Sequence, residues 1–125
     1  MQNLDQLRAA HAIKEAPKTD KASAAKLPAM ILTNGLLGAI AFAAEAEKPK
    51  RNSLKTAVTS ISLHLAQPAL GIPELHGVAT PEALATRLAG GSALTLQRAT
   101  SEALAYLSYL KRYAPKKDSA ARDAI

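Results

Sequence analysis

The sequence contains no cysteine and no tryptophan, and it has only three tyrosines and one phenylalanine among 125 residues. The absence of cysteine excludes disulfides, thiolate metal ligands and cysteine nucleophiles. β-Branched aliphatic residues are also scarce, with six isoleucines and two valines against 28 alanines and 18 leucines. Because alanine and leucine favour helices whereas strands favour β-branched residues, an all-β fold is effectively excluded. We predict an all-α fold, a single compact bundle of about five helices.

Negative charge is in short supply. Lysine and arginine number 16 against 10 acidic residues, which gives a net charge of +6 and a pI of about 9.8. This excess favours a polyanionic partner, with nucleic acid first and an anionic membrane surface second. The first 18 residues carry charges throughout and lack the apolar core of a secretory signal. We therefore expect a cytoplasmic protein.

One long run lacks charge altogether. Residues 27–44 form an 18-residue uncharged segment, at the length threshold for a membrane-spanning helix. Pro28, Asn34 and the many alanines within it weaken the case for membrane insertion. We predict instead that this segment is the central helix of the bundle, covered by the amphipathic helices that follow it. Gly35 and Gly38 would then allow close helix packing.

Start and stop signals divide the chain into five helical segments. The predicted segments are residues 3–16, ended by Pro17; Thr19 or Asp20 to about Glu47, kinked near Lys26 by Pro28; Asn52 or Ser53 to about residue 66; Thr80 to Gly90; and Ser92 to Ala114. Residues 67–79 are rich in proline and glycine and are predicted to form a loop. We expect residues 1–115 to form one helical domain and residues 116–125 to form a polar basic tail.

Catalytic and metal-binding patterns are missing. The three histidines lie in three separate segments without ligand spacing, and no glycine-rich phosphate loop is present. His64 falls off the apolar stripe of its helix, which predicts a solvated or interface histidine. The acidic residues mostly start helices or adjoin lysines, where they need no chemical role. We predict that the chain is not an enzyme and uses no metal and no cofactor.

Basic residues concentrate at three turns. The clusters are Lys14, Lys18, Lys21 and Lys26; Lys48, Lys50, Arg51 and Lys55; and Lys111, Arg112, Lys116 and Lys117. Such clusters suit contact with phosphates, although simple solvation or compensation of helix dipoles accounts for them equally well. Because aromatic residues are few, stacking platforms for bases are expected to be scarce. Any nucleic-acid binding would then depend on salt and ignore base sequence.

Five segments, in this order and spacing, resemble the small subunit of the type III-B CRISPR effector, the Cmr complex. They are Arg8-Ala-Ala-His-Ala, Lys26-Leu-Pro-Ala-Met-Ile, Asn34-Gly-Leu-Leu, Ala41-Phe-Ala and Ala105-Tyr-Leu-Ser-Tyr-Leu-Lys-Arg-Tyr-Ala. The resemblance covers the whole chain. It implies a non-catalytic subunit of an antiviral, RNA-guided ribonucleoprotein, whose copies stack as a minor filament beside the backbone subunits. Those backbone subunits cleave the target, and the small subunits help to bind guide and target RNA.

The resemblance places Lys26, Lys111 and Arg112 at positions where the family tends to be basic. On charge alone we extend the predicted RNA-binding set to Lys14, Lys18 and Lys55. The partners implied are the other Cmr subunits, further copies of this chain, guide RNA and target RNA, with no membrane. Apolar residues on the first helix and around Leu104 are candidate subunit contacts. Two alternatives are a stand-alone architectural DNA-binding protein and a protein scaffold whose cations only solvate it.

Overall fold

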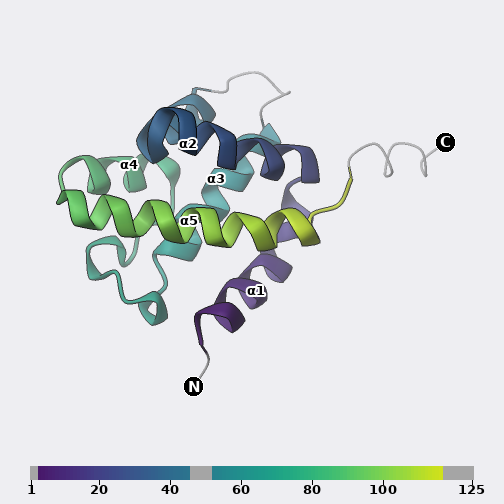
Figure 1. Ribbon diagram of the computed structural model, residues 1–125, viewed down its shortest axis with the longest axis horizontal. Helices are drawn as coiled ribbons and strands as arrows, with labels where there is room; N and C mark the ends of the chain where they lie inside the picture. The colour runs from purple at the N-terminus through teal and green to yellow at the C-terminus, as the bar shows by residue number, and fades with distance from the viewer. Residues whose placement is uncertain (1–2, 46–51, 117–125) are drawn as a thin grey trace.

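The chain folds into helices joined by short turns (Figure 1), in a computed structural model that describes residues 3–45 and 52–116. The helices are α1 (Leu4–Glu15), α2 (Lys21–Ala44), α3 (Asn52–Leu65), α4 (Pro81–Ala89) and α5 (Ala93–Tyr113). No strand occurs within the described residues. The all-α bundle of five helices is therefore confirmed. The basic turn at Lys48–Arg51 and the tail beyond Lys116 lie outside the described residues, so the predicted domain limits stay a prediction.

The predicted helix starts coincide with side chains that cap the backbone. Asp20 accepts a hydrogen bond from the Ser23 amide at 2.7 Å and begins α2. Thr80 caps α4 and Ser92 caps α5 in the same manner. A capping residue satisfies an amide that the helix itself leaves without a partner. These boundaries are local, which is why the sequence alone located them.

The hydrophobic core lies among α2, α3, α4 and α5. The stripe predicted on α3 is buried along its whole length, as are the inward residues of α5, which pack against α1, α2 and α3. The buried α3 stripe is Leu54, Val58, Ile61 and Leu65. The loop between α3 and α4 adds two short 3-10 turns, η3 (Pro68–Leu70) and η4 (Pro73–Leu75), and closes the end of the core with apolar side chains.

The prediction that residues 27–44 form the centre of the bundle is wrong. Helix α2 is long and apolar enough to span a membrane by length and composition, but only one third of its apolar window is buried. Leu27 and Ile40 are buried, whereas Leu32 is 75% exposed. The helix therefore covers one side of α5, as Figure 1 shows, rather than being enclosed. Within residues 27–44, the exposed positions include Ala29, Leu32, Ala41 and Phe42 and carry no charge, which explains why the whole segment reads as apolar.

The break in α2 also differs from the prediction. The helix continues through Pro28, and the interruption lies at Gly35, where φ is 79° and ψ is 164°. Nothing lies within 4 Å of where a Cβ on Gly35 would stand, so close packing is not its role. Only glycine adopts this backbone region readily. Gly35 therefore redirects the helix, and the following turns place Leu36, Ala39 and Ile40 in the core.

Candidate nucleic-acid interface

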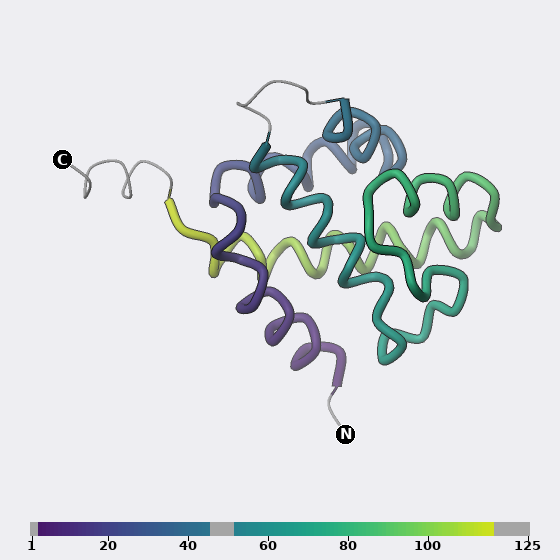
Figure 2. The backbone as a smooth tube through the Cα atoms, turned by 180° about the vertical axis from the view of Figure 1, so that it is seen from behind, coloured from purple at the N-terminus to yellow at the C-terminus, as the bar shows by residue number. Residues whose placement is uncertain are grey.

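Several of the predicted cations meet at one end of the bundle. The Lys21 amide donates a hydrogen bond to the Pro115 carbonyl at 2.9 Å, and Lys21 Nζ donates to the Arg112 carbonyl at 3.4 Å. The start of α2 therefore lies against the last turn of α5. We define the basic end as Lys18, Lys21, Lys111, Arg112 and Lys116. Both views of the backbone show these segments together at one end of the molecule (Figures 1 and 2).

The short turn η1 (Ala16–Lys18) ties this end of the molecule to α3. Thr19 Oγ1 donates a hydrogen bond to the Ser53 carbonyl at 2.8 Å, and η1 packs against both α3 and α5. Thr19 is buried although it lies between two helices. The chain ends of four helices thus share one side of the bundle. The C-terminal ends of α1 and α5 favour cations here, whereas the N-terminal ends of α2 and α3 oppose them.

The six residues predicted to bind RNA divide into two groups. Lys18, Lys111 and Arg112 belong to the basic end, and exposed Lys14 lies one turn before Lys18 on α1. Lys26 is exposed on α2, more than a turn beyond the basic end. Lys55 is drawn toward the start of α4, where its Nζ lies 3.8 Å from Glu82 Oε1. The predicted set missed Lys21, because only the tertiary contact with α5 reveals its place.

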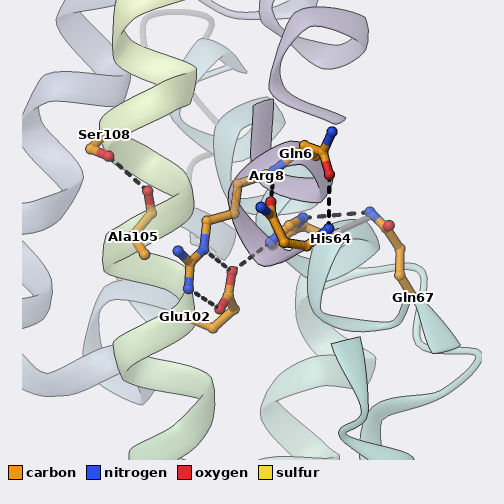
Figure 3. Close-up of polar contacts among 8 residues, drawn as sticks. Gln6, Arg8, His64, Gln67, Glu102, Ala105 and Ser108 are labelled. Carbon is orange, nitrogen blue, oxygen red and sulfur yellow. Dashed lines mark hydrogen bonds and ion pairs between the residues drawn. The ribbon is translucent and has the colours of Figure 1, made fainter. Parts of the chain in front are cut away.

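Away from the basic end, at the middle of α5, a partly buried polar network joins α1, α3 and α5 (Figure 3). Arg8 makes two hydrogen bonds of 2.8 Å to the two carboxylate oxygens of Glu102. His64 Nε2 lies 2.9 Å from Glu102 Oε2, and Gln67 Nε2 lies 3.4 Å from His64 Nδ1. Such a paired network fixes the position of α1 on the bundle, because separating it would leave charges without partners.

The prediction of a solvated or interface His64 is therefore wrong. Its side chain is fully buried, and Glu102 satisfies the ring nitrogen that faces α5. The sequence reading also missed Glu15 and Glu102 as buried acids. Spacing alone could have suggested only the local part of this arrangement, because His11 and Glu15 are four residues apart and therefore neighbours on one face of α1.

Three aromatic rings lie together in the interior next to this network. His64 and Tyr106 stack with centroids 4.1 Å apart and an interplanar angle of 11°. The ring of His11 lies 5.4 Å from each of them. His64 and Tyr106 are fully buried, whereas the His11 side chain keeps 13% of its surface exposed. The cluster therefore reaches solvent through His11.

The electrostatics of the network follow from burial and pairing. Burial alone would raise the pKa of Glu102, but hydrogen bonds from Arg8 and His64 lower that pKa to about 2. Burial, reinforced by the nearby His64, lowers the pKa of His11 to about 4. Burial raises the pKa of Tyr106, and the charge of Glu15 raises it further. At neutral pH, Glu102 is therefore ionised, whereas His11 and Tyr106 are neutral.

A metal or catalytic site does not emerge from these groups. Within residues 3–45 and 52–116, no three histidine, aspartate or glutamate side chains are arranged to hold a metal ion. The buried carboxylate of Glu102 is taken up by its two partners, and it serves to position helices. The main feature of the described surface is the cluster of cations at the basic end.

Comparison with known proteins identifies the family. The family model described as CRISPR-associated protein (Cas_Cmr5) matches residues 3–116, which is most of the chain. No curated protein and no solved structure matches it. The match agrees with the resemblance carried by the segments around Lys26, Asn34 and Tyr106. The chain therefore belongs to the Cas_Cmr5 family, the small subunit of the type III-B Cmr complex, whose members are generally non-catalytic.

Proposed function

We propose that this chain is a non-catalytic subunit that stacks as a minor filament in a cytoplasmic Cmr complex and helps to hold guide and target RNA. The observation that carries the proposal is the basic end, where four cations from η1, α2 and α5 converge with Lys116, which follows α5. Convergence from separate segments distinguishes this surface from cations that merely follow one helix. Contacts of this kind read the sugar-phosphate chain and leave base identity to the guide.

Dipole compensation is the main competing explanation for these cations. Lys21 does cap a carbonyl at the end of α5, so part of its charge serves the fold. Lys111 and Arg112 are exposed, and no carboxylate among the described residues pairs with either of them. Their charge is therefore available to phosphates.

Copies of the chain and the backbone subunits are proposed to contact the apolar residues that the fold leaves outside. On α1, Leu4 is 44% exposed and Ile13 is 54% exposed, on different sides of the helix. Leu104, the other predicted contact, is partly buried and packs against the core. The first helix is thus the better-supported subunit contact of the two.

The test is neutralisation of the basic end within the assembled complex. We expect Lys111→Gln with Arg112→Gln to weaken target RNA capture equally for unrelated sequences. When the logarithm of the affinity is plotted against the logarithm of the salt concentration, the slope should become shallower by about 1.4. Each phosphate contact on a single strand contributes about 0.7 to that slope. The measurement is RNA capture by the assembled complex across a series of salt concentrations.

The matched control is a charge change elsewhere on the same helix. Arg98 is also exposed on α5, about 21 Å from Arg112 at the helical rise per residue. Arg98→Gln should leave capture near its wild-type level, whereas Arg112→Gln alone should reduce it. Equal capture by the double variant and the wild type at physiological salt would refute the proposal and favour a scaffold role. Tight binding of duplex DNA without guide RNA would favour the architectural alternative.

A further inference from the structure

A groove of about 520 Å³ runs between α1 and the end of α3. Its volume falls within the range of about 300–1,000 Å³ that is usual for ligand pockets. Lys14 and Lys18 lie along one side, and Leu63 and Gln67 form the other. The ring of His11 lines the groove between them. Because Lys18 also belongs to the basic end, the groove continues that surface along the flank of α1.

The two lysines can serve a phosphate chain. Lys14 is exposed, and the side chain of Lys18 is 59% exposed although its Nζ lies 2.6 Å from Glu15 Oε2. The Glu15 carboxylate lines the groove and pairs with the ammonium group of Lys18, although its own side chain is 97% buried. Phosphates that pass along the rim therefore meet the charge of Lys14 in full, whereas Glu15 partly balances the charge of Lys18.

The wall of the groove suits a flat, uncharged group. His11 is the solvent-facing member of the three-ring cluster with His64 and Tyr106. Its low pKa keeps the ring neutral at physiological pH, so the 13% of the side chain that reaches solvent is an uncharged aromatic surface rather than a cation. The half-buried side chain of Leu63 provides apolar contact on the opposite side, and the Gln67 amide adds hydrogen-bonding capacity. Cations beside an aromatic surface are the combination that binds single-stranded nucleic acid.

We infer that this groove holds one base of single-stranded RNA against His11, while Lys14 and Lys18 contact the adjoining phosphates. The inference rests on the proposed function, because the strand would reach the groove across the basic end. It adds a base contact to a surface that otherwise recognises only phosphates. Stacking accepts any base, so the site would not select sequence.

The test compares a short oligouridylate with an abasic oligomer of the same length, each titrated against the full-length protein. Both probes carry the same phosphates, but only the first has bases. We expect the oligouridylate to bind at least about fivefold more tightly, which is the lower end of what one base stacked on an aromatic side chain contributes. His11→Leu should abolish the difference, and His11→Phe should retain it.

A second variant guards against misfolding of the histidine substitutions. Ala10 is exposed and lines the same groove, so Ala10→Leu fills the groove without altering the core. It should remove the preference for the oligouridylate while leaving the thermal unfolding transition unchanged. Equal affinity of the wild type for both probes, or a preference that survives both His11→Leu and Ala10→Leu, would overturn the inference.

The proposed function and this inference fail in different ways. Lys111→Gln with Arg112→Gln should weaken binding of both probes by the same factor and leave their ratio unchanged. If the wild type binds both probes equally while the double variant binds them more weakly, the RNA contact at the basic end is supported and the base site in the groove is refuted. If the wild type prefers the oligouridylate while the double variant binds as tightly as the wild type, the base site is supported and the contact at the basic end is refuted.

Discussion

Glu102 and Glu82 have the same local sequence, Glu-Ala-Leu-Ala, yet their environments are opposite. The Glu82 side chain is 60% exposed in the first turn of α4, where Lys55 is its nearest cation. Glu102 lies in the middle of α5, only 9% exposed, and is bonded to Arg8 and His64. Local sequence therefore cannot tell a surface acid from one that joins three helices.

Removing the charge of each glutamate should separate these roles. We expect Glu102→Gln to lower the free energy of unfolding by about 3 kcal/mol, because Arg8 loses its buried partner. Glu82→Gln should cost less than about 1 kcal/mol, since exposed pairs and first-turn acids contribute little. Urea denaturation of both variants at neutral pH measures the difference. Equal losses would show that the network does not hold α1 in place.

Acid should destabilise the protein in two steps. The pKa of His11 is lowered from 6.5 in the unfolded chain to about 4 in the folded protein. The unfolded chain therefore binds the proton at a higher pH than the folded protein does, and stability falls as the pH drops from 6.5 to 4. The pKa of Glu102 is lowered from 4.5 to about 2, so its contribution is complete above pH 4.5 and is lost as pH falls toward 2. Each step is worth on the order of 3 kcal/mol.

The variant His11→Phe isolates the first step. It keeps a ring in the cluster but removes the titrating group, so the loss of stability between pH 6.5 and 4.5 should largely disappear. The loss below pH 4.5 should remain, because Glu102 is untouched. Urea midpoints measured across this pH range provide the check. A variant that loses stability above pH 4.5 as steeply as the wild type would show that His11 is not the group responsible.

At the scale of the element, α2 depends on one glycine. Proline was the expected helix breaker, but Pro28 is accommodated within the helix, whereas Gly35 adopts a positive φ that redirects the chain. The two residues disturb a helix in different ways. Pro28 lacks one backbone amide hydrogen bond, and its ring crowds the carbonyl of the preceding turn. Gly35 instead adopts a backbone region that a side chain strongly disfavours. Gly35 therefore sets the position of the bend, and Leu36 and Ile40 beyond it are buried in the core.

Substitution by alanine should show this dependence. We expect Gly35→Ala to cost about 1–3 kcal/mol, because a residue with a Cβ is strained at φ 79° even though the space around it is open. Gly90→Ala is the control, since Gly90 has φ −90° and its nearest neighbour would be the Thr86 carbonyl oxygen at 3.5 Å. Thermal unfolding should be unchanged in the control. A harmless Gly35→Ala would mean that the bend is not imposed by the backbone.

At the scale of the whole molecule, most exposed apolar residues lie away from the basic end. Within the described residues, four of the six large ones lie on α1 and the outer side of α2, and Leu94 lies at the start of α5, whereas Tyr113 is exposed beside Arg112 in the basic end itself. Apolar surface away from the cations allows one subunit to contact RNA and neighbouring proteins at the same time. The predicted cations Lys26 and Lys55 lie outside the basic end, which concentrates the proposed RNA contact on fewer residues than charge alone suggested.

The helices follow from composition and from local patterns along the chain. Composition excluded strands, and capping residues such as Asp20, Thr80 and Ser92 located helix starts because their hydrogen bonds reach only a few residues along the chain. The apolar spacing on α3 likewise predicted its buried side, since a helix repeats locally. The excess of positive charge predicted a polyanionic partner in the same direct manner.

Which residues those helices bring together depends on how the bundle packs. The bond from Lys21 to α5 and the pairing of Arg8 with Glu102 join residues more than 90 positions apart, and no local pattern encodes such contacts. The burial of His64 and the partial exposure of α2 were misjudged for the same reason. A side chain's burial depends on which other helix covers it, and that is settled when the whole bundle packs.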